Sequence, residues 1–470
     1  MNFIHRLSSA FKAFGRAYAG ARLTPSQADY WNGGGTPNSE IRASRDRTAA
    51  RVRQLVRDMP WLDQSFDDSV AYKVGEGFNV KPAVVDGQGK MLLGENRRIK
   101  DAFLWWCEKA EVNGRDHFGD IQRMAVRQML ECGEAFIVYR YLKGEYRLQV
   151  YEPDCIDSSV SADDIDQGIR FDRDTNAFKG YFFRSLESSP LAAAAEAKEI
   201  PAEIVIHLYR ALRPWQRRGI SPLVQVSLLA ADLDQYLSNE ISAQQMTSRY
   251  LAFIQRAEGD DGSDHQGDDY IDNLTIRYLG AGESVQFAPG ANRPVTGLES
   301  FQDTFLRILS TILKVPFHVI TGKYTALNYN TLREIRNNAV HILKPEWAYL
   351  TRHLLQPVYD HWLDWAVASG ELSLKGYWSP AGKRHWRKCF FMPPGIESVD
   401  VLRDIKGVLA GRDAGIIDPQ DWIMGQGEDP DEVISGLSEF IAKLKAAGLD
   451  QQTGLAPGED TKLGQAPSEL

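Results

Sequence analysis

The stretch VPFHVITGKYTALNYNTLREI, residues 315–335, joins two long helical patterns through a short polar segment. Its centre, TGK at 321–323, is similar to the end of a phosphate-binding loop. Such a loop also needs a glycine earlier in the turn and a small hydroxyl residue directly after the lysine. Phe317 occupies the glycine position and Tyr324 follows the lysine, so the pattern fails twice. The stretch is better explained as a connection between helices than as a nucleotide site.

A very long helix is predicted after this connection. Thr331 and Glu334 have the spacing of a capping box, which marks a helix start. One apolar face then recurs at helical spacing to about residue 369. Pro345 and Pro357 lie inside this pattern, and we expect them to bend the helix without ending it.

A pair of helices carrying a small β module is predicted before the connection. Ser221 and Pro222 form a typical helix start, and the apolar stripe that follows continues to about residue 247. A second amphipathic helix, residues 298–315, ends at Pro316. Between the two helices, the short alternating runs YLAFIQ, LTIRYLG and SVQFAPG indicate strands.

The β module contains a strongly acidic segment, AEGDDGSDHQGDDYID at 257–272. Clustered carboxylates raise the question of calcium binding, but their spacing does not fit the twelve-residue calcium loop of EF-hands. We therefore favour a solvated acidic tip.

Mixed α and β patterns occupy residues 45–220. Gly75 and Gly77 lie where a helix is expected to give way to a strand, and a helical stretch is expected over 97–133. The alternating runs EAFIVYRYL, YRLQVYEPDCI and IVIHLYR predict strands, and SPLAAAAEAKEIPAE predicts an exposed insert. Towards the C-terminus we expect strands at GYWSP and HWRKCFFM, helices near 397–411 and 430–447, and a disordered end from 448.

The N-terminal segment is basic and amphipathic. Residues 1–22 carry aromatic residues at helical spacing and several Arg and Lys, and NGGGTPNS at 32–39 predicts a hinge. A helix on a membrane surface and a mobile arm that docks on a neighbouring protein both fit, and the arm is favoured.

Composition limits the classes of function. The sequence is 43% hydrophobic and 25% charged, with a net charge of −9, which argues against tight wrapping of nucleic acid. The four cysteines are far apart and predict neither disulfides nor a structural metal, so we expect a reduced cytoplasmic setting and no cofactor. No apolar run has the length of a membrane span. Enzyme signatures such as GxSxG and HExxH are absent from the sequence, so no catalytic residue is assigned.

Four stretches, in order, carry a family resemblance. They are SRDRTAARVRQLVRDMPWLDQSFDDSVAYKVGEGFNVKP, RPWQRRGISPLVQVSLLAADLDQY, VPFHVITGKYTALNYNTLREIR and DVLRDIKGVLAGRDAGIIDPQDWIMGQGEDPDEV. Together they resemble the landmarks of the lambda-like portal proteins of tailed bacteriophages, over about residues 40–445. The acidic tip and the Ala-rich insert near 191–197 have no counterpart that we can match.

The resemblance implies an α+β portal fold whose copies assemble as a dodecameric ring. It implies the following order along the chain: a basic arm and hinge at 1–44, an α/β wing at 45–220 completed by 370–395, a stem helix at 221–247, a clip at 248–297, a second stem helix at 298–320, a channel loop and long tunnel helix at 321–369, a helical crown at 396–447 and a disordered tail at 448–470.

The resemblance also implies function. The ring would occupy one capsid vertex of the virion, after assembly in the host bacterial cytoplasm, as the channel for DNA packaging and ejection. Implied partners are the terminase large subunit, the head–tail adaptor and head-completion proteins, the major capsid and scaffold proteins, and double-stranded DNA in transit, read without sequence specificity; no membrane is expected. The alternatives are a cytosolic scaffold at a membrane surface and an unrecognised enzyme.

Two sets of site residues follow. We expect weak phosphate contacts in the channel from Lys323, Tyr324, Asn328, Asn330, Arg333 and Arg336. In the clip, the acidic loop would be an electrostatic docking surface for a basic partner, formed by Glu258, Asp260, Asp261, Asp264, Asp268 and Asp269.

Overall fold

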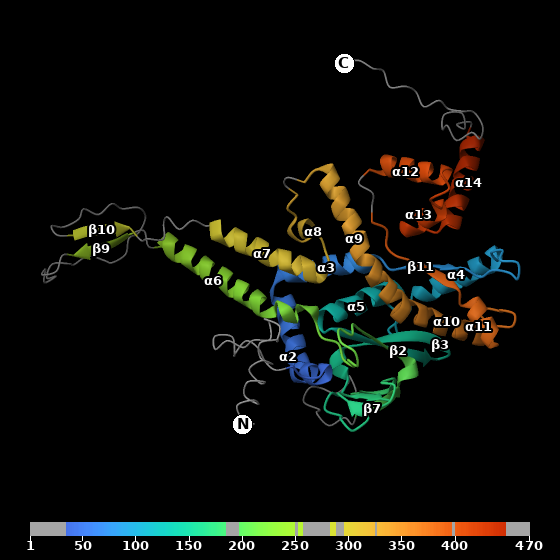
Figure 1. The fold of residues 1–470 in the computed structure, drawn as a ribbon, viewed down its shortest axis with the longest axis horizontal. Helices are drawn as coiled ribbons and strands as arrows, with labels where there is room; N and C mark the ends of the chain where they lie inside the picture. Colours follow the sequence, from blue (N-terminus) through green and yellow to red (C-terminus); the bar gives the residue numbers. More distant parts are fainter. Residues whose placement is uncertain are drawn as a thin grey trace, which may run out of the picture.

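The computed structural model describes residues 34–184, 197–249, 252–256, 283–287, 296–324, 327–396 and 400–447. Helices and short antiparallel sheets mix in a body from which a pair of helices projects (Figure 1). The mixed helix and sheet composition expected from the sequence is confirmed.

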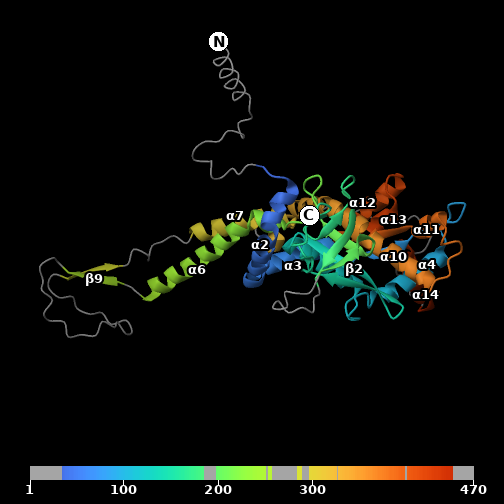
Figure 2. The same cartoon turned by 90° about the horizontal axis from the view of Figure 1, so that it is seen from below.

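The projecting pair consists of α6 (Ser227–Arg249) and α7 (Thr296–Leu313), which contact each other through the rings of Tyr236 and Phe301. Beyond their ends β9 (Ala252–Arg256) pairs antiparallel with β10 (Glu283–Phe287), and Figure 2 shows the same projection from a second direction. The third predicted strand, LTIRYLG, lies outside the described residues.

The start of the first of these helices differs from its prediction. Ser221 does cap a helical turn, but this is the 3₁₀ helix Pro222–Gln225, and α6 begins only at Ser227. The Ser221 hydroxyl also donates to the Leu130 carbonyl at 2.6 Å. This bond fixes the base of α6 to the body.

The N-terminal part of the body begins earlier than expected. Helix α2 (Pro37–Asp58) is capped by Thr36, whose hydroxyl accepts from the Ser39 amide. The predicted hinge at 32–39 therefore already contains the first helical turn, and Ile41 on that helix is buried. Helix α3 (Pro60–Val74) then ends at Gly75, as predicted.

The helical stretch expected over 97–133 is two helices, α4 (Leu93–Cys107) and α5 (Phe118–Glu131). His117 caps α5, because its side chain accepts from the Gly119 amide. Phe103 on α4 packs with its ring centroid 4.9 Å from that of Trp362, at the centre of the core.

Among the described residues, the body contains two sheets of more than two strands. The predicted strands form one of them in the order β3-β2-β8, from β2 (Glu134–Leu142), β3 (Glu145–Tyr151) and β8 (Val205–Tyr209). The second sheet was not predicted, and it contains β4 (Ile165–Asp166), β5 (Ile169–Phe171), β6 (Phe178–Phe183) and β7 (Lys198–Pro201). Because β7 pairs with β6, the predicted exposed insert ends in a strand rather than in a loop.

The long helix continues through both prolines, as predicted. It consists of α9 (Tyr329–Leu350), a π-helical turn (Thr351–Leu355) and α10 (Gln356–Ala368). The Gln356 amide donates to the Thr351 carbonyl, five residues back, directly before Pro357, which has no N–H to donate. In Figure 1, α10 continues from α9 at a shallower slope.

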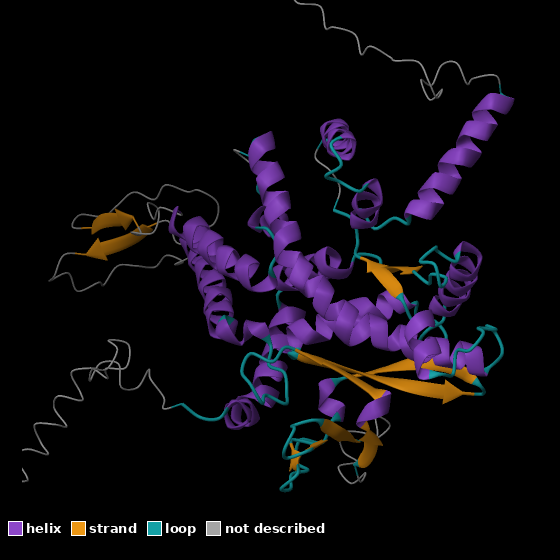
Figure 3. Cartoon of the chain, turned by 45° about the vertical axis from the view of Figure 1, so that its right-hand side comes forward, coloured by secondary structure: helices purple, strands orange, loops and turns teal. Residues whose placement is uncertain are grey.

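The C-terminal part departs from prediction at one strand. The segment GYWSP is a turn in which Ser379 caps α11 (Pro380–Trp386), so only β11 (Cys389–Met392) forms, paired with β1 (Asn79–Pro82). Three helices follow, α12 (Val401–Asp413), α13 (Pro419–Gly425) and α14 (Pro430–Ala446), of which α13 was not predicted. Figure 3 shows that helices make up most of the molecule, with the larger sheets below them and one strand pair beyond the projecting helices.

Candidate functional site

The connection between α7 and α9 folds as a short helix and a turn. Lys314 ends α7 with φ 61°, and α8 (Phe317–Thr321) follows. Gly322 ends α8 with φ 64°, a left-handed conformation that glycine adopts without strain. We call residues 322–336, from Gly322 into the first turns of α9, the connection segment; residues 325 and 326 within it are not described.

The predicted contact residues at its start are exposed. Tyr324 is 56% exposed, and Asn330 is exposed on the first turn of α9. The Lys323 Nζ atom lies 2.8 Å from Asp303 Oδ1 on α7. The lysine that resembled a nucleotide ligand is thus held by a carboxylate, which reduces the positive charge it presents.

Asn328 has a structural role that the sequence reading did not assign. Its side-chain oxygen accepts from the Thr331 amide at 2.9 Å and from the Thr331 hydroxyl at 3.0 Å, so Asn328 is the N-cap of α9. The predicted capping box at Thr331 and Glu334 is therefore wrong. Asn and Thr both cap helices well, and the choice between them depends on where the preceding turn places the chain.

Arg333 and Arg336 lie together, as expected, and share a partner that the sequence reading missed. An Arg336 Nη atom lies 3.1 Å from Asp404 Oδ2 on α12, and Arg333 lies 3.8 Å from the other oxygen of Asp404. Arg336 also donates to the Ile396 carbonyl at 2.9 Å. These contacts join the first turns of α9 to α12.

The electrostatics of the connection segment follow from these pairs. Three cations, Lys323, Arg333 and Arg336, lie beside two carboxylates, Asp303 and Asp404. The segment also contains the exposed carboxylate of Glu334, so positive and negative charges balance there, which is suited to weak contacts with phosphates rather than to tight binding.

The clip residues assigned from the sequence cannot be placed. Glu258, Asp260, Asp261, Asp264, Asp268 and Asp269 all lie outside the described residues, as does the basic helix predicted for residues 1–22.

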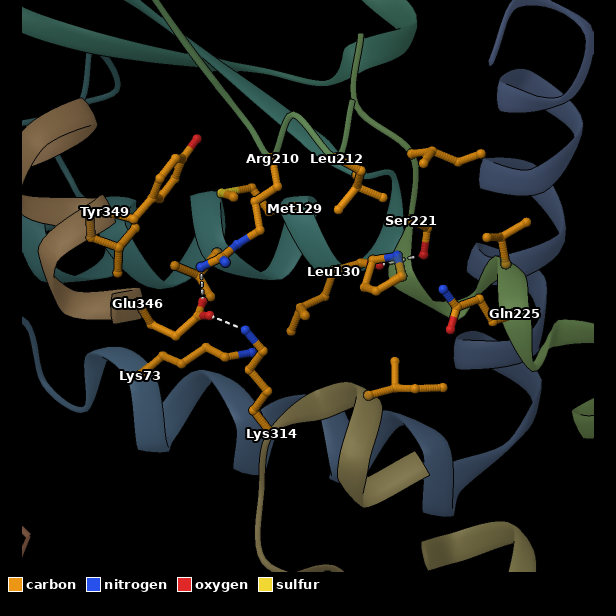
Figure 4. A pocket seen from close by; sticks show the side chains of 17 residues that line it. Lys73, Met129, Leu130, Arg210, Leu212, Ser221, Gln225, Lys314, Glu346 and Tyr349 are labelled. Atoms are coloured by element: carbon orange, nitrogen blue, oxygen red, sulfur yellow. Dashed lines mark hydrogen bonds and ion pairs between the residues drawn. The ribbon is translucent and has the colours of Figure 1, made fainter. Parts of the chain in front are cut away.

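A second charged cluster lies behind the connection segment, between α3, α7, α9 and the chain after β8 (Figure 4). Glu346 on α9 accepts from Lys314 Nζ at 2.5 Å and pairs with Arg210. Lys73 on α3 is 4% exposed, and its Nζ atom donates to the Ser69 hydroxyl at 2.7 Å. Burial lowers the pKa of Lys73 to about 8. These side chains line a cavity of about 180 Å³.

The sequence contained a signal for this cluster. The buried positions of α9 are Ala339, Leu343, Glu346 and Leu350, so Glu346 interrupts an otherwise apolar stripe. A carboxylate at such a position needs a cationic partner, because an unpaired buried charge is very costly. The partners come from distant parts of the chain and could not be named from the sequence.

A third cluster surrounds Glu134 at the start of β2. Its carboxylate, fully buried, lies 2.5 Å from Arg218 and 2.6 Å from Arg45, and it accepts from the Gly219 amide at 2.8 Å. His207 Nε2 lies 3.1 Å from it. Burial alone would raise the pKa of Glu134, but the charges of Arg218 and Arg45 and the contact with His207 together outweigh burial and hold this pKa well below its usual range.

No helix in the described part of the chain is long and apolar enough to cross a membrane. Among the same residues, His, Cys, Asp and Glu do not gather in groups of three or more that could hold a metal ion.

Comparisons with known proteins give a consistent family. The family model described as phage portal protein, lambda family, matches residues 24–344. A probable portal protein of Halomonas phage phiHAP-1 is 21% identical over 384 residues, which cover 77% of this chain and 73% of the relative. Portal protein B of Escherichia phage lambda is 20% identical over 197 residues, 41% of this chain and 37% of the relative.

Two solved structures have a limited similarity. A chain in the virion of a native gene transfer agent particle has a TM-score of 0.48 and 12% identity, covering 82% of this chain and 94% of that one. A chain in the neck of a native gene transfer agent particle, computed with C12 symmetry, has a TM-score of 0.46 and 12% identity, covering 82% and 94%.

Proposed function

Because the chain belongs to the lambda family of phage portal proteins, we propose that its copies form a closed ring at one capsid vertex and that double-stranded DNA passes through the ring during packaging and ejection. The match of the family model to residues 24–344 carries this proposal. The proposed location is the virion, after assembly in the host cytoplasm.

The architecture supports a division of roles within the ring. We assign α6 and α7 to the stem, β9 and β10 to a clip that projects from the capsid, and α12–α14 to the crown. The clip would dock the terminase large subunit and later the head–tail adaptor, while the body would contact major capsid and scaffold proteins. The long helix α9–α10 and the connection segment would line the channel.

Exposed apolar side chains on the C-terminal helices support assembly. Val401 and Leu402 on α12 are 57% and 65% exposed, and Ile434 and Phe440 on α14 are 55% and 53% exposed. Apolar surface gathered on neighbouring helices is typical of protein interfaces. We assign these faces to contacts between neighbouring copies in the ring.

The charge of the connection segment supports transport rather than capture. Each of its cations lies beside a carboxylate, so each copy contributes little net positive charge. Contacts with phosphates do not depend on base sequence, and weak ones allow the duplex to move.

Mass photometry of the purified chain, followed by electron microscopy of large species, tests the ring. A closed ring with a central hole is the expected result. A stable monomer at micromolar concentration, in the presence of capsid and scaffold proteins as well, would contradict it.

The role of the connection segment needs its own variant. Replacing Lys323 and Tyr324 with Ala is expected to lower the fraction of filled capsids that retain DNA, because two exposed contacts are lost. Normal retention by particles with normal rings would reduce this segment to an ordinary surface turn.

A further inference from the structure

A second basic surface lies far from the connection segment. Between Glu371 and Glu397 the sequence contains no Asp or Glu, yet it contains five Lys and Arg residues, namely Lys375, Lys383, Arg384, Arg387 and Lys388. The chain as a whole has a net charge of −9, so this stretch is basic in an otherwise acidic protein. We call the part of the molecule formed by α11 and the residues up to Phe390 the α11 surface.

The cations of the α11 surface line an open groove of about 800 Å³. Lys383 and Arg387 are partly neutralised by Asp364, at 3.0 and 2.7 Å, and Arg387 also lies 3.6 Å from Asp360, a carboxylate that lines the same groove. Arg384 and Lys388 are exposed, line the same groove, and form no ion pair with any residue in the described ranges. The groove therefore presents two free cations and two whose charge is shared.

Backbone hydrogen bonds hold the segment that carries these cations in place. Ser379 caps α11, and the Lys388 carbonyl accepts from the Ala83 amide at 2.9 Å, next to the pairing of β11 with β1. Trp378 and Phe390, which are 58% and 57% exposed, lie beside the cations, and Lys383 Nζ is 5.0 Å from the centroid of the Trp378 ring. Fixed cations with flat apolar neighbours match a surface of phosphates and sugars.

We propose that the α11 surface binds the phosphate backbone of double-stranded DNA outside the channel, without reading its sequence. The proposal rests on the proposed function, because that function brings duplex DNA to this protein. The two sites are separate: Figure 1 shows α11 at one end of the molecule, beside α10, whereas α8 and the start of α9 lie across the body from it. A duplex in contact with the α11 surface is therefore a different stretch of DNA from the one at the connection segment.

Covalently closed circular DNA isolates this surface. A closed circle cannot thread a closed ring, so its binding reports contacts outside the channel. We expect the Arg384→Ala/Lys388→Ala variant of the full chain to bind circular DNA roughly tenfold more weakly at low salt. The slope of log K against log salt should fall by about 2, because two phosphate contacts are lost.

A charge-matched control comes from elsewhere on the body. Arg51 on α2 and Lys198 on β7 are exposed and form no ion pair with a described residue. The Arg51→Ala/Lys198→Ala variant changes net charge equally and is expected to bind circular DNA like the wild type. All four side chains are exposed, so both variants should unfold at the wild-type temperature.

The outcomes separate this inference from the proposed function. Equal circular-DNA binding by the two variants would overturn the inference, even if rings form normally. Displacement of circular DNA by polyglutamate as readily as by linear duplex, at equal charge, would also overturn it in favour of an acidic protein partner. If the protein forms no rings and only the Arg384→Ala/Lys388→Ala variant loses binding of circular DNA, the inference about the α11 surface stands and the proposed ring is wrong.

Discussion

At the scale of single residues, the buried charges of Glu134 and Lys73 have opposite effects on stability. Glu134 is charged and surrounded by partners, with Arg45, Arg218, His207 and the Gly219 amide all within hydrogen-bond distance. Lys73 is also buried, but its ammonium donates to a neutral hydroxyl, that of Ser69. Removing the first charge should therefore destabilise the protein, whereas removing the second should not.

The Glu134→Gln substitution is expected to lower the free energy of unfolding by about 3 kcal/mol or more, because it leaves the fully buried Arg218 without a counter-charge and Arg45 with Asp46 alone. Urea unfolding followed by circular dichroism measures this. Glu131→Gln is the matched control: Glu131 pairs with Arg127 in a more exposed setting, and its loss should cost less than about 1 kcal/mol. An equal loss of unfolding free energy in the two variants would mean that the buried contacts of Glu134 do not stabilise the fold more than an exposed ion pair does.

Lys73 gives a prediction about pH. Its pKa is lowered to about 8 in the folded protein, below the ordinary lysine value, so between these values the unfolded chain binds more protons. Stability therefore rises with pH through this window, by on the order of 1 kcal/mol per pH unit. Lys73→Met removes the effect, so the difference in unfolding free energy between wild type and Lys73→Met should change steadily from pH 8 to pH 10, with the wild type gaining. A constant difference would show that Lys73 keeps an ordinary pKa.

At the scale of elements, the pattern of apolar residues predicted the long helices and strands but not the short strands. The apolar stripe of α9 and α10 and the alternation in β2 repeat over many residues, so each carries its own signal. Strand β4 has two residues and β5 has three, too few for any alternation to be read. They exist because they pair with neighbours in the sheet, and that information is not local.

At the candidate site, too, the sequence predicted local features but not long-range contacts. Its exposed residues could be named from the polar connection, because glycine and polar residues between two apolar stripes indicate a turn. Their partners could not: Asp404 meets Arg336 across 68 positions, and Asp303 meets Lys323 across 20. Pairs at such separations depend on how the helices pack, which a single sequence does not reveal.

The contact of Arg336 with α12 leads to a prediction about helix docking. Arg336 bonds both Asp404 and the Ile396 carbonyl, so Arg336→Ala should loosen α12 from α9 while leaving the body intact. Hydrogen exchange in residues 401–413 is expected to increase, with exchange in β2 unchanged. Arg333→Ala is the control, because its 3.8 Å contact with Asp404 is longer and more exposed. Faster exchange in β2 would show general unfolding rather than release of α12.

At the scale of the whole molecule, the proposed ring would multiply a small change in each copy. Asp303 lies beside Lys323 in every copy, so Asp303→Asn would remove one negative charge next to this lysine in each subunit. Linear duplex DNA is expected to need a higher salt concentration for release from Asp303→Asn rings, and a lower one from Lys323→Ala rings. A gel-shift titration over salt, made with linear and with closed circular DNA, measures both effects, and only the linear DNA should respond.

The control must remove the same negative charge from beside a cation elsewhere on the molecule. Asp163, 91% exposed, pairs with Arg173 at 3.0 Å in turns next to β4 and β5, so Asp163→Asn makes the same change in net charge away from the connection segment. If Asp303→Asn and Asp163→Asn shift the release of linear DNA equally, the effect belongs to net charge and not to the channel. If Asp303→Asn and Lys323→Ala shift it in the same direction, the pair acts through structure rather than through phosphate contact. Opposite shifts, confined to linear DNA, require that the connection segment lies where the duplex passes.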